Sequence, residues 1–179
     1  MIIIIHENNE WIAPFEEALQ KINADYQIWY VPDMSLDLSS VPPDAVYWNR
    51  MSASSHTRGH RYSPEMVAGI LSWLERHGRT VVNGPKALDL EISKIRQYQE
   101  LEKFSITTPK TFCAVEKEHL VEGAEKIGFP LITKHNRAGK GLGVMKFDKQ
   151  AALEGYLFGE NFDESIDGIT LLQEYVDSP

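Results

Sequence analysis

The first half of the chain alternates short apolar runs with amphipathic stretches. The run from Ile2 to Ile5 is β-branched and lacks polar alternation, which predicts a strand covered on both faces. Apolar residues then recur at three- and four-residue spacing from Trp11 to Ile22, which predicts an amphipathic helix. Further strands are predicted near 26–31, 45–48 and 80–82, and a second helix from Ser63. This order predicts a small parallel-sheet α/β unit whose binding edge lies at the strand C-termini.

The pattern changes from residue 87 onward. Apolar residues at helical spacing extend to Phe104, where the Thr-Thr-Pro sequence at 107–109 interrupts the helix. The elements predicted after this break are strands at 111–114, 131–135, 144–147 and 170–176 and helices at 117–127 and 150–158. A glycine-rich segment separates the second and third of these strands, so we expect 131–135 and 143–147 to be antiparallel neighbours.

Composition indicates a folded protein and narrows its partners. Hydrophobic residues make up 42% of the chain and charged residues 25%, which is ordinary for globular proteins. The net charge of −8 disfavours nucleic acid as a partner, although a local cluster of lysines can still bind a small anion such as ATP. The only cysteine, Cys113, excludes an internal disulfide; it is predicted to be a small core residue in a protein of the reducing cytoplasm. Since Ile2–Ile5 is too short to span a bilayer, no membrane partner is expected.

The segment from Leu131 to Val144 has the features of an anion site. Lys134 projects from the end of a predicted strand, and glycines follow at alternate positions, at Gly139, Gly141 and Gly143. Glycine permits positive φ and close backbone approach, so successive N–H groups can converge on a phosphate while Lys134 and Lys140 add positive charge. The spacing fits neither a Walker loop nor a dinucleotide fingerprint. The alternative is a plain hairpin with a Gly-rich turn and a solvated lysine.

Taken with three further segments, this loop resembles the ATP-grasp superfamily. The stretch from Gly128 to Lys134 is similar to the family pattern G-x-P-x-V-x-K, and 171–176 is similar to L-V-Q-E-Y-I. Lys94 looks like the lysine of the family's Asp-Lys helix start, with Ser93 in place of the aspartate, and Leu101 and 106–111 match the segment that follows. The resemblance implies that Lys94 and Lys134 contact the phosphates of ATP. It also assigns adenine to a hinge at Gln173, Glu174 and Val176, read by the carbonyl of Glu174 and the N–H of Val176.

The first domain resembles the pre-ATP-grasp domain of RimK-like ligases. The stretch 49–54 is similar to their P-R-I-G-A-S sequence, so Arg50, Ser52, Arg58 and Arg61 are candidates for binding a substrate carboxylate or phosphate. A solvated polar loop is the alternative. His56 and His60 have the spacing of a metal pair, but no acidic ligand is adjacent and no metal ligand is assigned in this chain.

The resemblance implies an α/β architecture in which a small parallel-sheet pre-ATP-grasp domain at 1–86 precedes the N-terminal α+β lobe of an ATP-grasp domain at 87–179. It implies an ATP-dependent carboxylate–amine (or thiol) ligase, close to the α-L-glutamate ligases, that works with ATP and Mg²⁺ through an acyl phosphate. Its substrates would be amino acids or peptides, and a homo-oligomer stays open. The chain would be truncated at the hinge, before the C-terminal lobe with its metal ligands, and inactive alone. The alternatives are a non-catalytic ATP-binding or interaction module and an unrelated doubly wound domain.

Overall fold

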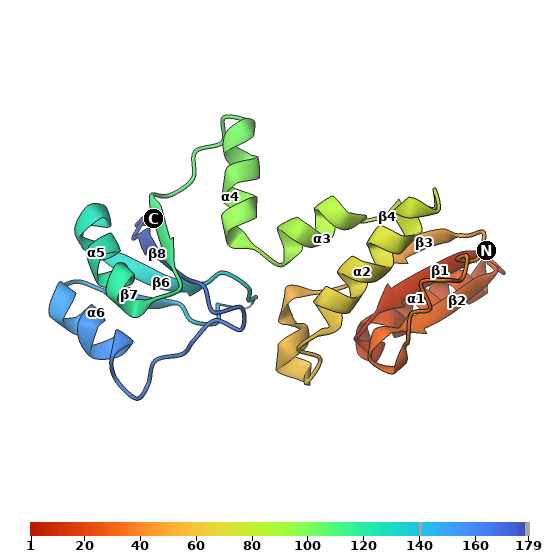
Figure 1. The fold of residues 1–179 in the computed structure, drawn as a ribbon, viewed down its shortest axis with the longest axis horizontal. Coiled ribbons are helices and arrows are strands. Elements are labelled where there is room, and N and C mark those ends of the chain that lie inside the picture. The colour runs from red at the N-terminus through yellow and green to blue at the C-terminus, as the bar shows by residue number, and fades with distance from the viewer. Residues whose placement is uncertain (140, 178–179) are drawn as a thin grey trace. The chain divides into compact units, whose positions relative to one another are not determined.

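The computed structural model describes residues 1–139 and 141–177. The chain divides into two compact units, Met1–Glu91 and Ile92–Pro179. Each unit has its own four-stranded sheet, and Figure 1 shows the helices that accompany each one. Within the described ranges, no helix is long and apolar enough to cross a membrane.

The first unit is a parallel α/β unit, as its alternating pattern predicts. Its elements are β1 (Ile2–His6), α1 (Asn9–Lys21), β2 (Tyr26–Tyr30), the 3-10 helix η1 (Val31–Asp33), β3 (Val46–Asn49), the 3-10 helix η2 (Ala53–Arg58), α2 (Ser63–Arg76), β4 (Thr80–Val82) and α3 (Pro85–Glu91). The strand order is β2-β1-β3-β4, with every pair parallel. This confirms the predicted sheet.

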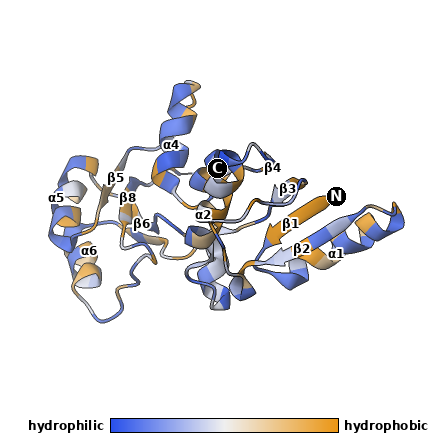
Figure 2. Cartoon of the chain, turned by 45° about the vertical axis from the view of Figure 1, so that its right-hand side comes forward, coloured by the Kyte–Doolittle hydropathy of each residue, from blue (hydrophilic) through white to orange (hydrophobic). Residues whose placement is uncertain are grey.

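The central strand β1 forms the core of the first unit. Ile3, Ile4 and Ile5 are completely buried, and Figure 2 shows β1 as a hydrophobic strand. The helix α2 contributes further buried residues, including Val67 and Ile70. Because β1 has a neighbouring strand on each side, its backbone groups are paired within the sheet, and its β-branched side chains fit both covered faces.

The helix α1 departs from the apolar stripe predicted for it. Its start is capped by Asn8, whose Oδ1 accepts hydrogen bonds from the N–H groups of Glu10 and Trp11. Of the stripe, only Ile12 is buried, whereas Trp11 is 42% exposed and Ile22 is 72% exposed. Trp11 packs instead against the guanidinium of Arg58 in η2. The buried face of α1 is therefore narrower than the apolar spacing predicts.

The second unit combines an antiparallel sheet with helices. Its elements are α4 (Lys94–Lys103), β5 (Thr111–Ala114), α5 (Lys117–Ile127), β6 (Leu131–His135), β7 (Met145–Phe147), α6 (Gln150–Leu157) and β8 (Thr170–Glu174). The strand order is β5-β8-β6-β7. The predicted antiparallel pairing of 131–135 with the strand after the glycines is confirmed, with Leu131 opposite Phe147.

The helical stretch predicted up to Phe104 is divided into two helices, α3 and α4, because Ser93 adopts an extended conformation and its Oγ caps α4. The second helix begins at Lys94, where the family resemblance implied a helix start. The prediction for Cys113 was wrong. Cys113 is exposed and not a core residue. It lies on β5, an edge strand on which Phe112 packs against the core, so the next side chain along the strand points away from the core.

Candidate functional site

Lys134 lies in the middle of the second unit's sheet and is held by a neighbouring strand. Thr133 and His135 are buried on one face of β6, and Lys134 alternates with them onto the other face. Its Nζ donates a 2.8 Å hydrogen bond to Oε1 of Gln173 on β8. The Nε2 of Gln173, which is buried, in turn donates to the hydroxyl of Thr111 on β5. The structure therefore brings two predicted ATP-binding residues, Lys134 and Gln173, into direct contact.

The glycine loop after β6 needs glycine at two of its three alternate positions. Gly141 and Gly143 have positive φ values of 75° and 68°. A Cβ at Gly143 would lie 2.1 Å from Cδ2 of His135, so this position accommodates only glycine. The carbonyl of Gly143 accepts from the hydroxyl of Thr133, and that of Gly139 accepts from the N–H of Leu142. The predicted contact residue Lys140 lies outside the described residues.

Lys94 reaches the same loop from a distant part of the sequence. It is the first residue of α4, and its Nζ donates a 2.7 Å hydrogen bond to the carbonyl oxygen of Ala138. Lys134 belongs to the strand that leads into this loop. Both lysines are thus attached to one strand-and-loop segment, although they lie 40 positions apart in the sequence.

The end of β8 continues into the predicted hinge. The side chain of Glu174 accepts from the N–H of Lys110, and the N–H of Glu174 donates to the carbonyl of Lys110. Beyond the strand, the N–H of Tyr175 donates to the carbonyl of Pro130, and Val176 is exposed. These bonds fix the path of the chain at the hinge, while the side chain of Glu174 is engaged with protein backbone.

In the first unit, a cavity of about 410 Å³ lies at the C-terminal edge of the sheet. It is lined by Trp11, Asn49, Arg50, Met51, Ser52, Asn83, Ala87, Leu88 and Glu91. Arg50 and Ser52 are the predicted substrate residues among them. The guanidinium of Arg50 lies over the rings of Phe15 and Trp48, 4.9 and 5.2 Å from their centroids. One of the residues that line the cavity is therefore a cation stacked on aromatic faces.

The polar rim of this cavity was not predicted from the sequence. Asn49 ends β3 and Asn83 follows β4, and each side-chain amide donates to the other residue's carbonyl. Glu91 accepts from the N–H of Ala53 with a distance of 3.1 Å. A signal was available, because residues at the C-terminal ends of neighbouring parallel strands meet at one edge of a sheet.

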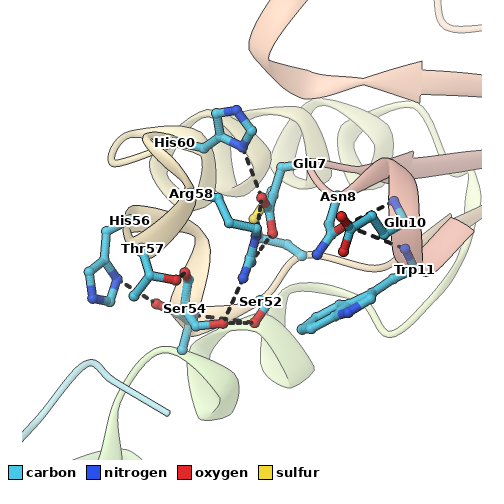
Figure 3. A network of polar contacts seen from close by, with 12 residues as sticks. Glu7, Asn8, Glu10, Trp11, Ser52, Ser54, His56, Thr57, Arg58 and His60 are labelled. Carbon is cyan, nitrogen blue, oxygen red and sulfur yellow. Dashed lines mark hydrogen bonds and ion pairs between the residues drawn. The ribbon is translucent and has the colours of Figure 1, made fainter. Parts of the chain in front are cut away.

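Arg58 is engaged inside the protein. Figure 3 shows its guanidinium beside Glu7, which follows β1 and is only 1% exposed. The Nε of Arg58 donates to Oε2 of Glu7 at 3.0 Å, and its Nη2 donates to Oε1. Nη1 also donates to the hydroxyl of Ser54. The bidentate geometry expected for a substrate anion is thus used on a carboxylate of the chain itself.

His60 completes the environment of Glu7. Its Nδ1 lies 2.9 Å from Oε2 of Glu7, and because a carboxylate only accepts, this nitrogen carries the proton. Burial alone would raise the pKa of Glu7, but the hydrogen bonds and charges of Arg58 and His60 outweigh it and hold that pKa below its ordinary value. Arg61, the remaining predicted substrate residue, contacts the exposed carboxylate of Glu65.

The described residues contain no group of three His, Cys, Asp or Glu side chains that could hold a metal ion. The buried cluster around Glu7 is instead an ion pair with a neighbouring imidazole.

Comparisons with known proteins extend over both units. No protein-family model matches the chain. The chain is 33% identical over 112 residues, 62% of its length, to the alpha-aminoadipate–LysW ligase LysX of Saccharolobus solfataricus, and covers 41% of that protein. Among solved structures it resembles a RimK domain ATP-grasp protein from Sphaerobacter thermophilus, with a TM-score of 0.68, 17% identity and coverage of 99% of this chain and 64% of the other.

A further structural likeness is to the ATP-grasp ligase PsnB, solved with a minimal precursor, Mg and ADP. Here the TM-score is 0.57 at 14% identity, over 98% of this chain and 63% of PsnB. The chain thus spans less than two thirds of the length of each of these three proteins.

Proposed function

Because this chain has the ATP-grasp fold in the form seen in RimK-like proteins, as its sequence motifs indicated, we propose that it is the front part of an ATP-dependent carboxylate–amine ligase. The observation that carries the proposal is the attachment of Lys94 and Lys134 to one segment, β6 with its glycine loop. One lysine on the strand and a second lysine bound to the loop that follows it suit a ligand with several negative charges, such as the phosphates of ATP.

In this proposal the second unit grips the nucleotide. Lys134, oriented by Gln173, and Lys94, oriented by Ala138, bind phosphate oxygens. The glycine loop adds main-chain N–H groups, and at Gly143 the ring of His135 excludes any side chain. The segment from Glu174, the last residue of β8, to Val176 receives the adenine ring. ATP supplies the phosphoryl group that activates a carboxylate as an acyl phosphate, which an amine then displaces. The proposal gives Mg²⁺ no ligand among the described residues.

The first unit, we propose, receives a substrate that carries a carboxylate. Arg50 and Glu91 both line the 410 Å³ cavity. This pair of opposite charges suits an amino acid or the end of a peptide. A relative at 33% identity is named for alpha-aminoadipate, which is an amino acid, and this supports the same substrate class. A glutamate-ligase-like reaction is the form of the proposal that we favour.

We propose in addition that the 179-residue chain binds ATP by itself without turning it over. The residues proposed to bind the phosphates all belong to the second unit. In the family that the chain resembles, the metal ligands follow the hinge. Phosphate release by this chain with Mg²⁺ and amino acids would contradict this part of the proposal.

The test is an ATP titration by calorimetry. Lys134→Ala removes a charge-assisted phosphate contact worth about 1.5 to 3 kcal/mol, which corresponds to an affinity about ten- to a hundredfold lower. The matched control is Lys103→Ala, because the Lys103 ammonium is exposed and pairs with Glu100 on the surface of α4. Equal affinities for wild type and Lys134→Ala would refute the assignment of this site.

A further inference from the structure

The start of α4, which carries Lys94, is held by a residue from another part of the chain. Asn136 directly follows β6 and is only 4% exposed. Its Oδ1 accepts hydrogen bonds from the N–H of Ile95 at 3.1 Å and from the hydroxyl of Ser93 at 3.2 Å. Its main-chain oxygen accepts from the N–H of Lys94. The first N–H groups of a helix have no acceptor within the helix, so Asn136 supplies acceptors that α4 itself lacks.

Asn136 is in turn fixed from its other side. Its Nδ2 donates to Oδ2 of Asp167 at 2.6 Å, and its main-chain N–H donates to the carbonyl of Ile169. The second oxygen of Asp167 accepts from Ser165 and from the N–H of Ile169. Since a carboxylate only accepts, Asp167 fixes which end of the amide faces it, and the amide oxygen is left pointing at α4.

These bonds matter because α4 buries none of its residues. In Figure 1 it lies apart from α5 and α6. A helix without a buried apolar face depends more on its polar contacts, because packing supplies most of the stability of an ordinary helix. Asn136 therefore helps to fix where α4 begins.

We propose that Asn136, oriented by Asp167, is a positioning residue that sets Lys94 against the glycine loop. The main-chain N–H of Lys94 is bound to Asn136, and its Nζ is bound to Ala138, two residues further along the same loop. Lys94 is thus held through both its main chain and its ammonium group by the segment that also carries Lys134. The inference rests on the proposed function, since its consequence is the strength of phosphate binding.

A double-mutant cycle with ATP as the ligand tests this role. If Asn136 acts through Lys94, Asn136→Ala weakens ATP binding about tenfold, the effect of one lost charge-assisted contact. The variant that combines Asn136→Ala with Lys94→Ala then binds no more weakly than Lys94→Ala alone. Combined with Lys134→Ala, in contrast, the effect of Asn136→Ala adds to that of the second substitution. The control is Asn8→Ala, which removes the same kind of helix cap from α1 in the first unit and leaves ATP affinity unchanged.

Hydrogen exchange without nucleotide gives a second readout. Asn136→Ala is expected to speed exchange at the amide of Ile95, which loses its side-chain acceptor, and to leave the amides within β6 protected. Ser93→Ala removes one of the bonds to Asn136 together with the capping bond from the N–H of Arg96, and it serves if Asn136→Ala does not fold.

The outcomes separate this inference from the proposed function. Unchanged ATP affinity in Asn136→Ala, or an effect that adds to that of Lys94→Ala, overturns the positioning role and leaves the ATP site standing. Failure of the wild-type chain to bind ATP overturns the proposed function, and the role of Asn136 falls with it.

Discussion

The two units hold their cationic side chains in opposite ways. In the first unit, Arg58 is neutralised by Glu7, a carboxylate that is almost completely buried. In the second unit, Lys134 donates to the neutral amide oxygen of Gln173, and within the described part of the chain it forms no ion pair. A cation whose charge is neutralised by a buried carboxylate has a structural role. A cation that is oriented by a neutral amide has no counter-charge from that amide and can bind an anionic ligand. This difference separates structural from ligand-binding cations.

The largest effect is expected at the compensated pair. Glu7→Gln leaves the guanidinium of Arg58 without its counter-charge in a largely buried place, which costs about 3 kcal/mol of unfolding free energy. The four tryptophans, at positions 11, 29, 48 and 73, all lie in the first unit, so their fluorescence in urea reports its unfolding. The control is Glu65→Gln in the exposed pair with Arg61, where a change below about 1 kcal/mol is expected. Equal losses in the two variants would remove the distinction between the pairs.

A second prediction concerns the glycine loop. Gly143→Ala places a Cβ against the ring of His135 and also strains a positive φ, so we expect the second unit to lose about 2 kcal/mol. Gly141→Ala is the matched control: its φ is equally positive, but a Cβ there meets no atom within 4 Å. It should cost about 1 kcal/mol, the conformational strain alone. Urea unfolding followed by circular dichroism measures both, and equal losses would show that contact with His135 does not matter.

The pH dependence of the first unit follows from two neighbouring groups. Burial lowers the pKa of His6 below 6.5, so the unfolded chain binds more protons below that pH and stability falls as the pH drops through 6.5. The pKa of Glu7 is also lowered, so its contribution is complete above 4.5 and is lost as the pH falls through the folded value. A difference of one in pKa corresponds to about 1.4 kcal/mol.

Tryptophan fluorescence in urea at several pH values tests this order. We expect His6→Leu to remove the loss that begins near pH 6.5 and Glu7→Gln to remove the loss below pH 4.5. Stability that is constant from pH 8 to pH 5 in the wild-type protein would contradict the assignment to His6.

The strands and most of the helices were predictable because their signals are local. A β-branched run such as Ile2–Ile5 and a glycine loop such as 139–143 carry their preferences within a few residues. The pairing of Glu7 with Arg58 was not predictable, because the two residues are 51 positions apart in the sequence and meet only when the chain has folded. The same holds for Asn136, whose acceptor role becomes visible only when α4 lies beside it.

Some local signals have a second meaning. Ser93 replaces the aspartate of the family motif, and a serine before a helix is also an N-cap. Its Oγ accepts from the N–H of Arg96, and this cap separates α4 from α3. Glu7 directly follows a fully buried strand, and a carboxylate in that position requires a partner. That rule would have directed attention to the arginines of the 50–61 loop as internal partners as well as substrate contacts.

The smallest expected effect tests Arg50, a cation of the first unit that, like Lys134, has no part in the ion pair with Glu7. Its guanidinium is held by the faces of Phe15 and Trp48. Arg50→Lys keeps the charge but loses planar stacking, so we expect a loss of about 0.5 to 1 kcal/mol by tryptophan fluorescence in urea. Arg61→Lys is the control, because Arg61 lies over Tyr62, which is 74% exposed, and its replacement should cost less. If Arg50 is a ligand-binding cation, its replacement by lysine should disturb the fold far less than Glu7→Gln does. A loss as large as that of Glu7→Gln would instead make Arg50 a structural cation and would count against its proposed role in binding a substrate carboxylate.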